Sequence, residues 1–215
     1  MNASRTPARR AALAAVAATA AVSLAACGDN GSSTGQSASP TVSASSSAGA
    51  PAPSGTHNAA DVSFAKGMIP HHRQAVQMAE MAGSHGASPQ VEDLAGKIKK
   101  AQGPEIKTMS GWLEAWGEKV PEDMDGMGGM DHGGSSPMPG MMGMHEMGEL
   151  KKSSGHAFDT MFLTMMVKHH QGAVQMATTE QKSGAYGPAR KLAQDIITSQ
   201  NAEISQMQQM LGNKK

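Results

Sequence analysis

The feature that most constrains the fold is an internal duplication. Residues 61–109 and 159–207 align without a gap at an offset of 98, and 19 of the 49 positions are identical. The identical positions include an aspartate at the start of each unit, a phenylalanine four places from the start, a pair of adjacent histidines and several methionines. The folded part of the chain therefore contains the same structural unit twice.

Each unit has the pattern of two amphipathic helices. In the first helix of the first unit, residues at a spacing of three or four form one stripe: Phe64, Met68, His71, Ala75, Met78 and Ala82. Residues 83–87 interrupt this pattern, and Ser88-Pro89 predicts the start of a second helix. The second unit is interrupted at 184–188. Neither helix pair can cover its apolar stripe alone, so the sequence predicts an all-α, ferritin-like four-helix bundle over residues 59–211.

The first 26 residues have the pattern of an export signal. Three arginines precede an alanine-rich apolar run, residues 11–26, which is shorter than the roughly 20 residues that a membrane span needs. The run ends in Leu24-Ala25-Ala26-Cys27, which resembles the bacterial lipoprotein signal box. The resemblance implies cleavage before Cys27 and a lipid on its sulfur, which would anchor the protein to the outer face of the cell membrane. An ordinary signal peptide with an incidental cysteine is the alternative.

The composition limits the remaining possibilities. Residues 27–58 consist mostly of Gly, Ser, Thr, Ala and Pro, which predicts a disordered tether with a reach of about 30 Å. The chain has 18 basic and 18 acidic residues, a balance that argues against nucleic-acid binding. With one cysteine, it can form no intramolecular disulfide.

The duplicated histidines and methionines are candidate metal ligands. They are His71, His72, Met68 and Met78 in the first unit, and His169, His170, Met166 and Met176 in the second. Thioether sulfur suits Cu(I), whereas imidazole suits copper, zinc, iron or nickel. A di-iron site is disfavoured, because such bundles require Glu-x-x-His motifs and several inward-facing glutamates.

Polar residues also fall in the apolar stripe of each second helix: Gln102, Glu105, Gln200 and Glu203. A buried carboxylate is costly unless it is paired or hydrogen-bonded, so we expect these groups to face the histidines and to orient their rings. The alternative is a buried polar network that fixes the register of the helices and binds no ligand.

A methionine-rich segment, residues 121–149, lies between the two units. The chain has 19 Met against 3 Phe, and eight of these methionines together with two histidines are candidate ligands here: Met124, Met127, Met130, His132, Met138, Met141, Met142, Met144, His145 and Met147. The abundance of glycine predicts a mobile loop that does not contribute to a core. Closely spaced thioethers on such a loop could wrap Cu(I) or Ag(I); low-complexity drift and an adhesive apolar surface are the alternatives.

The helical motifs resemble a known family. Met68-Ile69-Pro70-His71-His72, followed by Ala75-Val76-Gln77-Met78-Ala79, is similar to the signature of the domain-of-unknown-function family 305, and so is the pattern of residues 94–113. The resemblance covers about residues 59–211 and implies a ferritin-like bundle that is commonly exported. Some members are periplasmic copper-binding proteins linked to copper resistance, which implies the same eight histidines and methionines as ligands.

The second unit departs from the family pattern at two positions. Lys168 stands where the first unit has Pro70, and Gly172 stands where it has Gln74. These differences leave the histidine pairs intact, but they argue against equal affinity of the two halves.

The sequence thus predicts a binding protein more readily than an enzyme. The leading hypothesis is sequestration or transfer of copper outside the cytoplasmic membrane. A metal-dependent redox enzyme and a non-catalytic interaction module of the cell envelope are the alternatives. The sequence identifies no protein partner.

Overall fold

The computed structural model describes residues 55–122 and 138–212, and every regular element in these two ranges is helical. The elements are α1 (Ala59–Glu80), the short 3-10 helix η1 (Ala82–Ser84), α2 (Pro89–Ala115), α3 (Met144–Lys152), α4 (Gly155–Ser183) and α5 (Gly187–Gly212). The predicted all-α class is confirmed. None of the helices in the described ranges is long and apolar enough to cross a bilayer. The expected export signal, Cys27 and the tether up to residue 54 lie outside these ranges.

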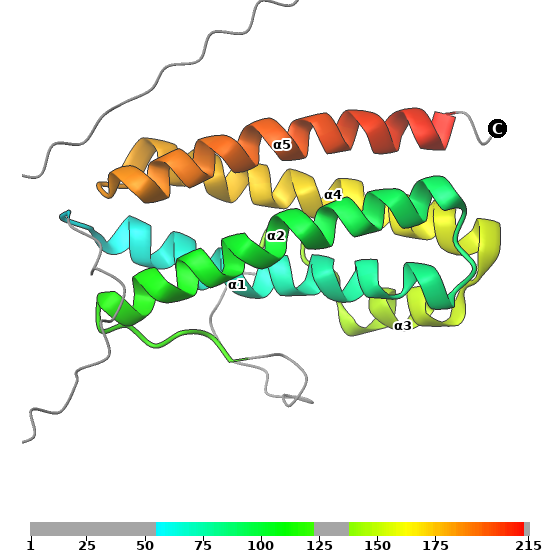
Figure 1. Ribbon diagram of the computed structural model, residues 1–215, viewed down its shortest axis with the longest axis horizontal. Helices are drawn as coiled ribbons and strands as arrows, with labels where there is room; N and C mark the ends of the chain where they lie inside the picture. The colour runs from blue at the N-terminus through cyan, green and yellow to red at the C-terminus, as the bar shows by residue number, and fades with distance from the viewer. Residues whose placement is uncertain (1–54, 123–137, 213–215) are drawn as a thin grey trace, which may run out of the picture. The chain divides into compact units, whose positions relative to one another are not determined.

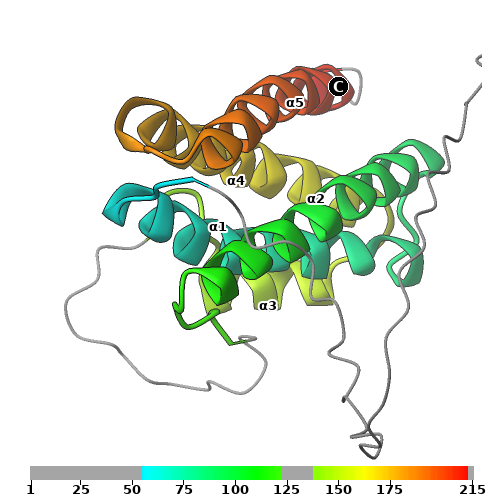
Figure 2. The same ribbon diagram turned by 60° about the vertical axis from the view of Figure 1, so that its left-hand side comes forward.

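Four long helices form the bundle as two hairpins, one from each repeat unit (Figure 1). Helices α1 and α4 pack against each other, while α2 lies on α1 and α5 lies on α4 (Figures 1 and 2). The predicted four-helix bundle of two duplicated helix pairs is therefore confirmed. The arrangement brings the first helix of each unit, which carries the paired histidines, to the centre of the molecule.

The two units are tied together by a reciprocal contact at their turns. Asp61, in the first turn of α1, accepts hydrogen bonds from the backbone N–H groups of Tyr186 (3.0 Å) and Ala185 (3.2 Å). Asp159 of α4 accepts one from the backbone N–H of Ser88 (3.0 Å). Ser88 and Tyr186 occupy the same position in the repeat, as do Asp61 and Asp159. The contacts are thus related by an approximate two-fold symmetry between the units.

The start of α2 differs in one detail from the expected serine cap. Ser88 is the N-cap residue, but its side chain makes no capping hydrogen bond. The carboxylate of Asp159 from the other unit binds its backbone N–H instead. The cap of this helix therefore depends on the packing of the two units, which local sequence cannot reveal.

Two apolar clusters fill the bundle, and the paired histidines separate them. On α1, apolar residues of 64–69 belong to one cluster and those of 75–79 belong to the other. On α4 the order is reversed, with residues 158–166 in the second cluster and Ala173 and Ala177 in the first. The histidines of both helices lie between these stretches. The core thus consists of two apolar ends and a polar middle layer.

The segment that follows residue 137 departs from the expected loop. Helix α3 begins at Met144, inside the range 121–149, and the side chains of Met142 and Met147 are buried in the core. The expectation that no methionine of this range contributes to a core is wrong for these two. Gly140 adopts a left-handed backbone conformation (φ +77°), which turns the chain onto the bundle.

Candidate metal centre

Four histidines from α1 and α4 form the polar layer. His71, His72, His169 and His170 are all at most 1% exposed. The rings of His71 and His169, which are equivalent positions of the repeat, lie with their centroids 3.7 Å apart at an angle of 40°. The structure thus brings together the four imidazoles that the sequence singled out, at the crossing of the two central helices.

Two of the histidines pair with the glutamates of the outer helices. His72 Nε2 lies 2.7 Å from Glu105 Oε2, and His170 Nε2 lies 2.6 Å from Glu203 Oε2. A carboxylate can only accept a hydrogen bond, so Nε2 is the protonated nitrogen of each ring. The remaining nitrogen, Nδ1, therefore carries an unshared lone pair when the ring is neutral.

The other two histidines lie in a more apolar environment. His71 Nε2 lies 3.0 Å from the carbonyl oxygen of Pro139, which again assigns the proton to Nε2. Burial and the adjacent His72 lower the pKa of His71 to about 3. Burial also lowers the pKa of His169 well below its ordinary value, an effect that the backbone of His71 partly offsets. Both rings are neutral near pH 7, which is the form that binds metals.

Several buried polar atoms of this layer have no hydrogen-bond partner in the described part of the chain. They are Nδ1 of all four histidines, Nε2 of His169, and the side-chain oxygens of Gln102 and Gln200. A buried polar atom without a partner costs about 1–3 kcal/mol, so a cluster of them requires an explanation. A bound cation would supply one. Metal-ligating histidines commonly donate their second ring N–H to a carboxylate or a carbonyl, as His72, His170 and His71 do here.

The candidate methionines flank the histidines within the two apolar clusters. Met68 belongs to one cluster, against which Met176 packs, and Met78 and Met166 belong to the other. Within residues 55–122 and 138–212, no three His, Cys, Asp or Glu side chains are arranged to hold a metal ion. A cation in this layer would therefore need thioether ligands beside the imidazoles. That donor set fits Cu(I) better than zinc or iron.

Residues 138–143 cover this layer, a feature that the sequence did not reveal. The side-chain amide of Gln74 donates to the carbonyl oxygen of Met142 (2.9 Å) and accepts from its N–H (2.8 Å). On the facing helix, a Cβ at Gly172 would lie 1.9 Å from the carbonyl oxygen of Pro139. Positions 74 and 172 are equivalent in the repeat, and their difference was the available signal. Gln74 binds residues 138–143, and Gly172 leaves room for them.

The remaining candidates of the methionine-rich range have different surroundings. Met124, Met127, Met130 and His132 lie outside the described residues. Met138 and Met141 are half-buried on the segment over the histidines, whereas Met144 (82% exposed) and His145 project into solvent. Of this set, the structure places only residues 138–142 beside the histidine layer.

Comparison with known proteins identified relatives of the same architecture. Residues 61–211 match the family described as Domain of unknown function (DUF305). A DUF305 protein from Streptomyces coelicolor, inferred to be secreted, is 32% identical with a TM-score of 0.63, over 72% of this chain and 93% of that chain. A DUF305 fragment from Deinococcus radiodurans is 28% identical with a TM-score of 0.62, over 73% of this chain and 97% of that one.

A second group of structures is of CopM in metal-bound forms. CopM in the Cu(II)-bound form is 36% identical with a TM-score of 0.60, over 72% of this chain and 97% of that chain. The Cu(I)-bound form is 34% identical with a TM-score of 0.57, over 71% and 96% of the two chains. The search of curated proteins gave no match.

Proposed function

Because this chain belongs to the DUF305 family, we propose that it is a copper-binding protein whose ion lies in the histidine layer between α1 and α4. The observation that carries the proposal is the set of buried ring nitrogens without partners at the crossing of these helices. CopM, a relative with 36% identity, has been crystallised with copper. The protein would sequester the ion or pass it on, without catalysing a reaction.

The ligands would be shared by the two units. We assign the imidazoles of His71 and His169 as the central pair, since their rings are in contact. His72 and His170, each bound to its glutamate, would join them through Nδ1 only after their rings move, because no three of these side chains surround one point in the described residues. One or two thioether ligands would complete the coordination, taken from the flanking methionines: Met68, Met78, Met166 and Met176. Such a mixture of soft and borderline donors favours Cu(I).

The N-terminal sequence is the basis for proposing where the protein acts. We propose that the exported chain is anchored through a lipid on Cys27 and works outside the cytoplasmic membrane. Membrane fractionation of cells that express the natural chain or Cys27→Ser tests the anchor. We expect the natural chain in the detergent-soluble membrane fraction and the variant in the soluble extracytoplasmic fraction. Equal distribution of the two chains would contradict the anchor without affecting the copper site.

Competition titration tests the metal site. The exported chain is titrated with Cu(I) in the presence of a chromophoric Cu(I) chelator, beside a double variant in which His71 and His169 are alanine. We expect the double variant to bind copper at least tenfold more weakly. The matched control replaces His85 and His156, which lie outside the histidine layer, and should leave the affinity unchanged.

A deletion separates the helical site from the methionine-rich range. Removal of residues 123–137 leaves every residue of the histidine layer and of the covering segment in place. We expect one copper ion to remain bound with unchanged affinity. Complete loss of binding in this deletion, together with full binding in the double histidine variant, would refute the helical site.

A further inference from the structure

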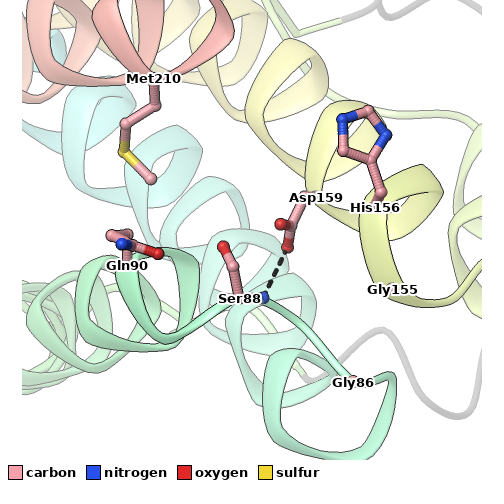
Figure 3. Close-up of a pocket in the computed structure, with 7 residues that line it drawn as sticks. All are labelled: Gly86, Ser88, Gln90, Gly155, His156, Asp159 and Met210. Carbon is pink, nitrogen blue, oxygen red and sulfur yellow. Dashed lines mark hydrogen bonds between the residues drawn. The ribbon is translucent and has the colours of Figure 1, made fainter. Parts of the chain in front are cut away.

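A cavity of about 500 Å³ lies where the turn before α2 meets the start of α4 and the end of α5 (Figure 3). Its lining includes Gly86, Ser88, Gln90, His156, Asp159 and Met210. Met210 reaches into it from α5, and Asp159 binds the backbone of Ser88 at its floor (Figure 3). The volume is within the range of about 300–1,000 Å³ that is typical of small-molecule sites. None of these residues belongs to the histidine layer.

The two-fold symmetry of the units shows what the equivalent space contains at the other end of the bundle. Ser88 corresponds to Tyr186, and Met210 corresponds to Trp112, at the same offset of 98. The Tyr186 side chain is buried there, with its ring edge-on to Trp112 (5.6 Å between centroids, 84°). Trp116 contacts the same ring at 5.3 Å and 87°. One end of the bundle thus encloses an aromatic ring where the other end has a cavity.

The turn is held by the same hydrogen bond at both ends, although its backbone differs: Gly86 has φ +62°, whereas the equivalent Gly184 has φ −70°. The N–H of Ser88 and the N–H of Tyr186 each donate to the equivalent aspartate, both at 3.0 Å. In addition, serine in place of tyrosine and methionine in place of tryptophan leave this end without the two rings that fill the other end. The thioether of Met210 remains as a favourable contact for an incoming ring.

One polar atom in the cavity wall indicates what such a ring should carry. Ser88 Oγ has no hydrogen-bond partner in the described part of the chain and is covered in its present rotamer. Rotation about the Cα–Cβ bond of Ser88 would turn this hydroxyl toward the cavity. A hydroxyl group on the ligand could both donate to this atom and accept from it. We propose that this cavity binds a small free phenol, with its ring against Met210 and its hydroxyl at Ser88.

The proposal is tested on the copper-free exported chain with p-cresol, which is the isolated side chain of tyrosine. The readout is the NMR signal of the Met210 methyl group and of the Ser88 amide. We expect saturable shifts of both signals. Toluene, which lacks the hydroxyl, should bind about fivefold more weakly, and Ser88→Ala should remove this difference because the hydrogen bond is then lost.

Two variants that copy the other end of the bundle provide the second test. Ser88→Tyr and, separately, Met210→Trp should fill the cavity, abolish p-cresol binding and raise the melting temperature. Absence of saturable shifts in the natural chain would overturn the proposal, as would equal binding of toluene or unchanged binding in both variants. Binding of N-acetyltyrosinamide without binding of p-cresol would also overturn it, and would point to a tyrosine of a polypeptide instead. Copper affinity is not measured here, so this result is independent of the metal site.

Discussion

His71 and His169 occupy equivalent positions in the two units and lie with their ring centroids 3.7 Å apart at an angle of 40°, yet their hydrogen bonding differs. His71 donates to the carbonyl of Pro139, whereas neither ring nitrogen of His169 has a hydrogen-bond partner within residues 55–122 and 138–212. The difference arises because residues 138–143 form hydrogen bonds with α1, through His71 and Gln74, whereas they lie against α4 at Gly172. The duplicated layer is therefore symmetric in its side chains and asymmetric in its surroundings.

Replacement of His169 by leucine should lower the copper affinity without lowering the stability of the fold. The change removes two buried nitrogens without partners, and each such atom costs about 1–3 kcal/mol. We expect the free energy of unfolding of the copper-free protein, measured with urea, to stay the same or to rise by about 1 kcal/mol. Copper affinity should fall at the same time. A histidine retained only for packing would give the opposite result, a loss of stability with unchanged affinity.

His170→Leu is the contrasting change on the same helix. It removes the partner of Glu203, which lies 2.6 Å from the imidazole in a largely buried position. The carboxylate would keep only the partial hydration that its 20% exposed side chain allows. We therefore expect the free energy of unfolding to fall by about 1–3 kcal/mol. Similar stability of the two leucine variants would mean that the histidine–glutamate pairs contribute little to the fold.

Gly172 should be essential for the segment over the histidines. A Cβ at this position would lie 1.9 Å from the carbonyl oxygen of Pro139, which is backbone and cannot rotate away. We expect Gly172→Ala to lower the free energy of unfolding by about 1–3 kcal/mol, in spite of the higher helix propensity of alanine. The matched control is Gly111→Ala in α2, where nothing lies within 4 Å, and it should stabilise by about 0.5–1 kcal/mol. Equal effects would show that the segment does not pack on α4.

Gln74→Ala should expose a methionine without unfolding the bundle. The side chain of Gln74 forms two hydrogen bonds with the backbone of Met142, whose own side chain is 5% exposed. Without them, residues 138–143 should detach more often, and a thioether that reaches solvent is oxidised faster. We expect the rate of Met142 sulfoxide formation in dilute peroxide, measured by mass spectrometry, to rise several-fold. Met144, which is already exposed, is the internal reference and should not change.

Periodicity and self-comparison were sufficient to predict the four long helices and the histidines that they bury, but not helix α3. The periodicity is a local signal, because the apolar stripe recurs within each helix. The duplication is a repeated signal, and it assigns His71 and His169 to equivalent positions. Two equivalent helices that each bury one stripe have few ways to pack, so the prediction extended to the bundle. The pairing of Glu105 with His72 could also be foreseen, because a carboxylate in an apolar stripe needs a partner.

The features that the sequence did not reveal depend on differences between the units. One unit has Gln74 where the other has Gly172, and this difference cannot be interpreted until residues 138–143 are seen to pack between the two positions. The cavity at Ser88 is visible only by comparison with the buried ring of Tyr186. Identity between repeats predicts the common fold, whereas the sites that break the symmetry require coordinates.

A further break of symmetry is the buried carboxyl of Glu180, which has Ala82 as its counterpart in the first unit. Burial and the neighbouring Asp61 raise its pKa to about 8, although Arg190 opposes the effect. Burial alone would raise the pKa of Asp61 as well, but hydrogen bonds from Glu180 and from three backbone N–H groups hold it below its ordinary value. Near pH 7 Glu180 therefore carries a proton, while the neighbouring Asp61 is ionised.

This proton makes stability depend on pH in a predictable direction. Between about pH 4.5 and pH 8 the folded chain retains the proton and the unfolded chain has lost it, so stability declines as the pH rises through this window, by at most about 1.4 kcal/mol per pH unit. Glu180→Gln keeps a neutral side chain of nearly the same shape beside Asp61 and removes the titration. We expect the free energy of unfolding of the variant, relative to the natural chain, to increase from pH 5 to pH 8 by a few kcal/mol. The buried histidines are common to both chains and cancel in this difference. A difference that is constant between pH 5 and pH 8 would show that Glu180 is ionised in the folded protein.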